Sequence, residues 1–89
     1  MVVCYNKKFL KDLASIPKKD RDKIEDFVFE EINSYSSSSK CHKLEKLAGY
    51  QYYFKVRFGN YRVGIKLDNE ELTFERVLHR KEIYNCFRS

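Results

Sequence analysis

The chain has 89 residues, of which 43% are hydrophobic and 16% aromatic, and this content excludes a disordered chain despite 35% charged residues. A chain of this length builds one small core, so we expect a single domain over residues 1–89. The net charge of +5 comes entirely from residues 32–89, which hold eleven Lys/Arg against six Asp/Glu. This asymmetry favours a polyanionic partner, although composition alone leaves a mildly basic surface equally open.

Cysteines and apolar runs bear on location and cofactors. Cys4, Cys41 and Cys86 are widely spaced, with no CxxC pair and no apolar signal segment, which is typical of reduced thiols in a cytoplasmic protein. No apolar run approaches the roughly 18 residues of a membrane span. The Cys41-His42 pair lacks a second ligand pair at zinc spacing, and no glycine-rich phosphate loop occurs. We therefore expect no metal, no cofactor and no membrane partner.

The first 35 residues predict one strand and two helices. The apolar run "MVVCY" favours a strand at residues 1–5, and Asn6 can cap a helix over residues 6–15. Pro17 suits the first turn of a second helix that reaches residue 35. Its apolar stripe is formed by Ile24, Phe27, Val28, Ile32 and Tyr35.

The remaining residues predict a three-stranded meander. "SSSS" ends the second helix, and residues 40–50 read as a helical turn or loop closed by Gly49. The turn between the first two strands has Gly59 and Asn60, which can both adopt positive φ. The expected fold class is α+β: a small single domain with a mostly antiparallel twisted sheet and two N-terminal helices packed on one face. The expected element order is β-α-α-β-β-β, and the chain then ends in a short C-terminal helix or tail after the strand over residues 72–79.

The hairpin "YYFKVRFGNYRVGIKL", residues 52–67, carries cations on one face and apolar residues on the other. Pairing across the turn places Arg57 opposite Arg62, and neighbouring like charges destabilise a sheet unless something neutralises them. The hairpin contains no acid, although Glu75 on the next strand could reach one cation. Fixed cations without carboxylates favour a phosphate ligand, and the alternative is a solvated edge that resists aggregation. The outward cations are Lys55, Arg57, Arg62 and Lys66.

The segment "VLHRKEIY" adds His79, Arg80, Lys81 and Tyr84 at the end of the last strand. Cations near Tyr84 favour its phenolate and make it a candidate base, and it could instead stack on a nucleobase. The simpler alternatives are a packing role for Tyr84 and a hydrogen-bonded strand-end role for His79.

These segments resemble the RelE/ParE superfamily of type II toxin–antitoxin toxins, through "KLAGY", "KVRFGNYRVGI" and "VLHRKEIY". The superfamily includes mRNA endoribonucleases and DNA gyrase poisons. Similarity to the RelE-type nucleases implies an enzyme that cuts mRNA on the ribosome, near the 16S ribosomal RNA, without a metal. It also implies a cognate antitoxin protein as partner. The implied catalytic positions are Lys55, Arg57, Arg62, Arg80 and Tyr84, with His79 as an alternative acid or base.

The implied reaction is attack of an RNA 2′-OH on the adjacent phosphate. We expect Arg57 and Arg62 to stabilise the phosphorane, and Lys55 or Tyr84 to act as base. Arg80 would hold the phosphate or assist the leaving oxygen, while Lys66 and Lys81 would contact RNA. A gyrase inhibitor on the same fold and a non-catalytic nucleic-acid-binding module remain alternatives.

Overall fold

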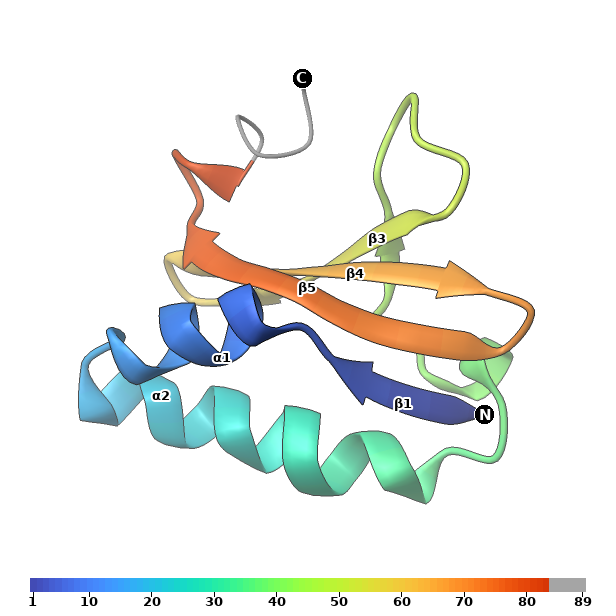
Figure 1. Ribbon diagram of the computed structural model, residues 1–89, viewed down its shortest axis with the longest axis horizontal. Helices are drawn as coiled ribbons and strands as arrows, with labels where there is room; N and C mark the ends of the chain where they lie inside the picture. Colours follow the sequence, from blue (N-terminus) through green and yellow to red (C-terminus); the bar gives the residue numbers. More distant parts are fainter. Residues whose placement is uncertain (84–89) are drawn as a thin grey trace.

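The computed structural model describes residues 1–83. It has a five-stranded mixed sheet with helices on one side (Figure 1). The strand order is β1-β5-β4-β3-β2, with β1 parallel to β5 and every other pair antiparallel. The predicted α+β class and the two helices packed on one sheet face are confirmed. The main elements are β1 (Val2–Tyr5), α1 (Lys7–Ala14), α2 (Lys18–Glu25), β2 (Glu45–Lys46), β3 (Tyr53–Phe58), β4 (Tyr61–Asp68) and β5 (Glu71–His79).

The helices begin where the capping residues lie. Asn6 accepts a hydrogen bond from the Lys8 backbone N–H at 2.9 Å, which satisfies one free donor of the first turn of α1. The second predicted helix is three consecutive segments, because α2 continues as a π turn (Asp26–Glu30) and a 3₁₀ turn (Glu31–Ser34). The π turn holds an extra residue and the 3₁₀ turn tightens the end. The apolar stripe remains continuous across these segments and is buried at Ile24, Phe27, Val28 and Ile32.

The segment over residues 40–50 was predicted as a helical turn or loop, and that prediction missed β2. Glu45 and Lys46 form a two-residue edge strand that pairs with Lys55 and Phe54 of β3. Two residues are too few to show the alternation that identifies a strand in sequence. A short 3₁₀ turn (Ser38–Lys40) precedes this strand. β2 therefore adds a carboxylate and a lysine to the edge of the hairpin.

The turn between β3 and β4 differs from the prediction at one residue. Gly59 has φ of 58°, but Asn60 does not have positive φ, so the prediction of positive φ at both residues is wrong at Asn60. Positive φ at the first central residue alone is the pattern of a type II′ turn. The turn between β4 and β5 has positive φ at both central residues, with 50° at Asn69 and 60° at Glu70.

A bulge in β5 decides which of its side chains face the core. Arg76 pairs with Gly64 and Phe74 pairs with Ile65, so Glu75 is an extra residue without a partner on β4. Phe74 and Val77 can therefore both be buried although they lie three positions apart. Arg76 is turned to the opposite face of the sheet, where strict alternation from Phe74 would have placed it in the core.

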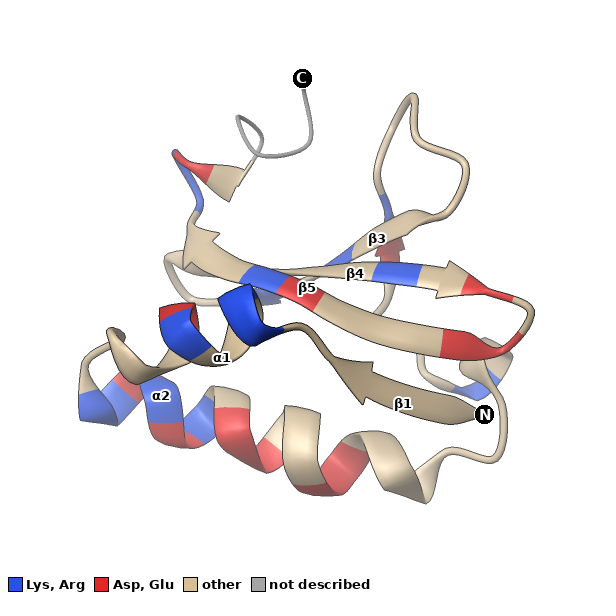
Figure 2. Ribbon diagram, in the orientation of Figure 1, with Lys and Arg blue, Asp and Glu red and all other residues tan. Residues whose placement is uncertain are grey.

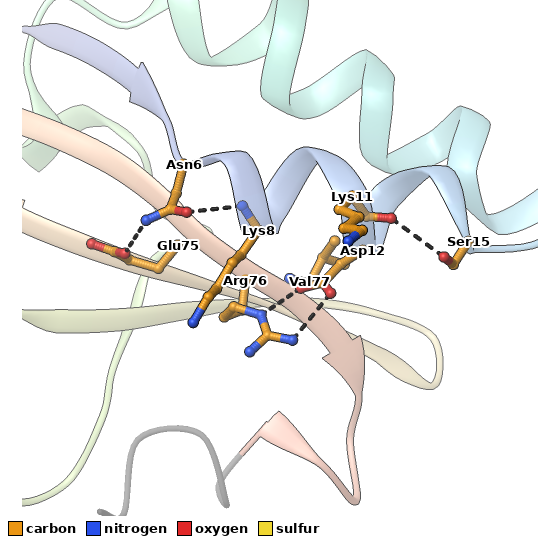
Figure 3. A network of polar contacts seen from close by, with 8 residues as sticks. All are labelled: Asn6, Lys8, Lys11, Asp12, Ser15, Glu75, Arg76 and Val77. Atoms are coloured by element: carbon orange, nitrogen blue, oxygen red, sulfur yellow. Dashed lines mark hydrogen bonds and ion pairs between the residues drawn. The ribbon is translucent and has the colours of Figure 1, made fainter.

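α1 lies along β5 beyond the end of β1, and Asp12 joins the two elements (Figure 3). Its carboxylate accepts from Arg76 Nε at 2.6 Å and Nη2 at 3.1 Å, and from the Val77 backbone N–H at 3.3 Å. The Asp12 side chain is only 15% exposed. It thus satisfies a backbone donor on the stretch of β5 that β1 does not reach.

Replacing Asp12 by alanine should lower the free energy of unfolding by about 2 kcal/mol, because the half-buried Arg76 guanidinium and the Val77 N–H lose their acceptor. Urea denaturation followed by circular dichroism measures this change. Asp22→Ala is the matched control, since the Lys18–Asp22 pair is exposed and should contribute less than about 1 kcal/mol. Equal losses in the two variants would contradict the role given to Asp12.

Among residues 1–83, no helix has the length and apolar character needed to cross a lipid bilayer. Cys4 and Cys41 are both free thiols, and Cys41 is buried in the core cluster.

Candidate functional site

Five basic side chains share the sheet face opposite the helices, and we call this surface the cationic face. Val56 and Val63 are buried toward the helices, so the residues next to them in β3 and β4 point to the other side. Figure 2 shows the resulting basic positions on three neighbouring strands. The cationic face consists of Lys55, Arg57, Arg62, Lys66 and Arg76.

Arg57 and Arg62 are directly opposite each other, as the hairpin register predicted. The Leu67 N–H donates to the Tyr52 carbonyl at 2.8 Å, and alternation from that bond makes the Arg57–Arg62 pair a non-hydrogen-bonded one. In such pairs the Cα atoms are about 4.5 Å apart and the side chains are at their closest. The two guanidinium groups therefore leave neighbouring Cβ positions on the same face.

Glu45 neutralises one of these two cations. Arg57 donates from Nε and Nη2 to the Glu45 carboxylate oxygens, at 2.8 Å and 2.9 Å. The expected partner, Glu75, instead accepts from the Asn6 side-chain amide at 3.2 Å (Figure 3). The sequence did not predict Glu45 as a partner, because Glu45 lies outside the hairpin, in an edge strand too short to be predicted from the sequence. The side-on pairing leaves Nη1 of Arg57 directed away from this carboxylate.

The Arg62 guanidinium is held over the turn between β3 and β4. Its Nη1 donates to the Gly59 carbonyl at 2.7 Å and to the Tyr61 carbonyl at 2.9 Å. The other guanidinium nitrogens make no hydrogen bond within residues 1–83. Arg62 is therefore oriented by backbone oxygens while it keeps donors for a ligand such as a phosphate.

The two lysines of the cationic face lie in different surroundings. Lys55 is half-buried and pairs with Gly64 on one side and Glu45 on the other. Lys66 is exposed and lines a polar cavity of about 300 Å³ together with Asp68, Glu71 and Glu75. These carboxylates make the Lys66 end of the face less attractive to an anion than the Arg57–Arg62 end.

His79, the last residue of β5, and Arg80, which follows it, have different surroundings. The Arg80 backbone N–H donates to the Asn60 carbonyl at 2.8 Å, which brings Arg80 to the turn beside Arg62. His79 pairs with Tyr61 and contacts its ring at 6.0 Å between centroids, on the side where the helices pack. The structure therefore does not bring His79 together with the cationic face.

The last predicted site residues lie at the limit of the described chain. Lys81 is exposed, and its backbone N–H donates to His79 Nδ1 at 3.2 Å. Tyr84 lies outside the described residues 1–83. The predicted catalytic roles of Tyr84 and His79 stay predictions.

Arg76 is the residue of the cationic face that sequence reasoning missed. It lies across from Gly64, and its guanidinium is tied to α1 by Asp12. The β5 bulge that turns it outward has no sequence marker, since "FERV" contains neither Gly nor Pro. Within residues 1–83, no three His, Cys, Asp or Glu side chains gather as metal ligands.

Comparison with known proteins agrees with the fold and with this arrangement of strands. The family described as "ParE toxin of type II toxin-antitoxin system, parDE" matches residues 3–84. Toxin RelE3 of Methanocaldococcus jannaschii is 40% identical over 87 residues, which is 98% of this chain and 99% of that protein.

Solved structures share the fold. A RelB–RelE antitoxin–toxin complex from Methanococcus jannaschii has a chain with a TM-score of 0.75 and 38% identity, covering 92% of this chain and 95% of that one. The RelBE2 toxin–antitoxin complex of Mycobacterium tuberculosis matches with a TM-score of 0.69 at 21% identity, covering 89% of this chain and 96% of that one.

The five-stranded sheet with two helices on one face is thus a fold that this chain shares with a toxin of the RelE/ParE superfamily. The chain belongs to the ParE-toxin family of type II toxin–antitoxin systems, and it is a RelE-like toxin.

Proposed function

We propose that this toxin is an endoribonuclease that inhibits translation by cutting mRNA in the ribosome. The observation that carries the proposal is the Arg57–Arg62 pair, in which each guanidinium is oriented by an oxygen partner and keeps free edges. Two oriented guanidinium groups that extend from neighbouring positions on the same face suit the extra negative charge of a phosphorane. RNA cleavage by the 2′-OH requires this kind of charge stabilisation, and a metal is not needed to supply it.

The chain supplies the remaining roles around this pair. Lys55 lies two positions before Arg57 on the same face of β3 and is one candidate to accept the 2′-OH proton. Tyr84 is the other candidate. Arg80, tied to the turn through its backbone, could hold the phosphate or assist the departing 5′-oxygen. Such a modest acid–base set is effective where the ribosome holds mRNA in a geometry close to attack.

The proposed physiological partner is a cognate antitoxin. The similar chain from Methanococcus jannaschii was solved as a RelB–RelE complex, and a basic toxin is matched by an acidic or amphipathic chain that folds upon binding. The proposed place of action is the cytoplasm, where translating ribosomes and mRNA are found.

Inhibition of DNA gyrase is the second candidate function, and the name of the matching family favours it. The two candidates predict opposite results in two assays of the purified toxin. An mRNA endoribonuclease should stop synthesis of a reporter in a reconstituted translation system and leave gyrase supercoiling unchanged. Trapped gyrase–DNA cleavage complexes without mRNA cuts would overturn the proposal.

Glu45 should act as a positioning residue for Arg57 in this reaction. We expect Glu45→Gln to lower the cleavage rate about tenfold, because the guanidinium loses a charged acceptor that fixes its orientation. Single-turnover cleavage on programmed ribosomes measures the rate, with exposed Glu82→Gln as the matched control. Faster cleavage by Glu45→Gln would instead mean that Glu45 competes with the RNA phosphate for Arg57.

A further inference from the structure

A groove of about 460 Å³ lies at the sheet edge where β3 extends past β2. β2 pairs only with Lys55 and Phe54, so no other strand among residues 1–83 covers this edge of β3 from Val56 to Phe58. Arg57 belongs both to the groove and to the cationic face, which makes the two surfaces continuous. The groove is lined by His42, Lys43, Glu45, Val56, Arg57 and Phe58.

Backbone groups of Arg57 also face this groove. The Tyr53 carbonyl accepts from the Leu47 N–H at 3.0 Å on the β2 side, and alternate residues of a strand direct their backbone groups to the same edge. The Arg57 N–H and carbonyl are therefore on that side, where no residue within 1–83 forms a backbone hydrogen bond with them. A backbone N–H next to a guanidinium is a suitable pair of donors for a phosphate.

Lys43 is a second cation at the groove. Its Nζ donates to Glu31 at 2.9 Å and lies 5.3 Å from the centroid of the Phe27 ring. Hydrogen bonds from Tyr35 and Lys43 hold the pKa of Glu31 below its usual value, so Glu31 remains charged at neutral pH. The Lys43–Glu31 pair is exposed and therefore weak, so Lys43 can offer its remaining donors to a ligand.

Rings supply the apolar part of the groove. Phe58 packs on buried Phe27 with ring centroids 5.6 Å apart, which fixes one wall. His42 is exposed and forms no hydrogen bond or ion pair with another residue of the described part of the chain. Rings alternating with cations are how proteins recognise unpaired nucleotides, whose bases stack while their phosphates pair with Lys and Arg.

We propose that this groove binds one nucleotide of single-stranded RNA next to the phosphate that is cut. Lys43 and Arg57 contact its phosphate, and the base lies between His42 and the Phe58 wall. The groove volume lies within the roughly 300–1,000 Å³ usual for small-ligand sites, which is sufficient for a nucleotide. This inference rests on the proposed RNA-cleaving function and extends the RNA path from the cationic face around the edge of β3.

The test measures RNA affinity separately from cleavage. A fluorescein-labelled hexauridine with 2′-O-methyl groups cannot be cut, and its anisotropy reports binding to the purified toxin. We expect His42→Ala/Lys43→Ala to weaken binding about tenfold. Loss of one phosphate contact should also reduce the slope of log affinity against log salt by about 0.7.

Two control variants separate this role from general effects. Lys23→Ala removes the same charge from exposed α2 and should leave affinity within twofold of wild type. Glu31→Gln breaks the Lys43 ion pair but keeps the lysine, so it should not weaken RNA binding. If Glu31→Gln weakened RNA binding as much as the double variant does, the loss would come from a change in local structure and not from lost contacts of His42 and Lys43 with RNA. That result would overturn the proposal.

The remaining outcomes distinguish this proposal from the proposed function. If wild type cuts mRNA but the double variant binds RNA normally, the nucleotide site is wrong and the endoribonuclease function stands. If wild type neither binds hexauridine nor cuts mRNA, both proposals fail. If the double variant binds hexauridine normally but loses affinity for a poly-glutamate peptide, the groove is a site for an acidic chain and the RNA proposal is overturned.

Discussion

Arg62→Ala is expected to lower mRNA cleavage by about 10²- to 10³-fold, the usual cost of removing an oriented donor from a charged transition state. Arg62 is directly opposite Arg57, and its orientation is fixed by the Gly59 and Tyr61 carbonyls. The alanine variant loses only the two side-chain hydrogen bonds to these carbonyls, so its Tm should decrease by no more than about 5 °C. Single-turnover cleavage and a thermal melt of the same preparation measure both quantities.

Arg62→Lys is the informative control for this prediction. A lysine keeps the charge but lacks the planar guanidinium that can donate to the two carbonyls and to a phosphate at the same time. Arg62→Lys should therefore restore less than about a tenth of the lost rate. Full activity in Arg62→Lys would show that charge alone suffices. Normal cleavage by a folded Arg62→Ala variant would show that Arg62 is not part of the active site.

Phe74→Ala should have the largest effect on stability, with a loss of about 3–5 kcal/mol. Phe74 is fully buried, and its ring lies 5.4 Å from that of Tyr5, 5.3 Å from that of Phe9 and 6.4 Å from that of Phe27, between centroids. These contacts join β1, α1 and the π turn to β5. A chain of this size has a total stability of about 4–13 kcal/mol, so this variant should lose a large fraction of its stability.

Equilibrium urea denaturation measures this loss, and exposed Tyr52→Ala is the matched aromatic control. Tyr52 is 42% exposed, so its replacement should cost less than about 1 kcal/mol. Any activity that Phe74→Ala loses should decline in step with its folded fraction, whereas Arg62→Ala should be inactive while folded. A Phe74→Ala variant as stable as Tyr52→Ala would contradict the position of Phe74 at the centre of the core.

The sequence predicted the facing arginines because three local signals agree in this hairpin. Apolar and basic residues alternate on both strands, a two-residue turn separates them, and Gly59 supplies the positive φ that such a turn requires. These signals together fix the register, and with it the face on which each cation lies. The Arg57–Arg62 pair was therefore predictable to the residue.

The partners of the cations were not predictable in this way. Glu45 reaches Arg57 from a two-residue strand, too short for any periodicity, and Asp12 reaches Arg76 from a helix 64 residues away in sequence. The β5 bulge also shifts the alternation without a Gly or Pro to mark it. Long-range pairing and bulges depend on tertiary packing, which local patterns do not encode.

The end of the last strand shows the same limit. "VLHRKEIY" places four predicted site residues close in sequence, but the pairing of His79 with Tyr61 takes His79 to the helix side of the sheet. Arg80 is brought to the turn by a single backbone hydrogen bond to Asn60. The assignment of proton transfer to Lys55 or Tyr84 is tested only by activity measurements on variants of each.

The most direct test of the central claim is primer extension on a reporter mRNA in a purified translation system, with wild type and Arg62→Ala side by side. The proposed function predicts cuts inside codons that appear only when ribosomes translate and that disappear with Arg62→Ala. An intact mRNA with the folded wild-type toxin would contradict it, and the cationic face would then be a docking surface rather than an active site.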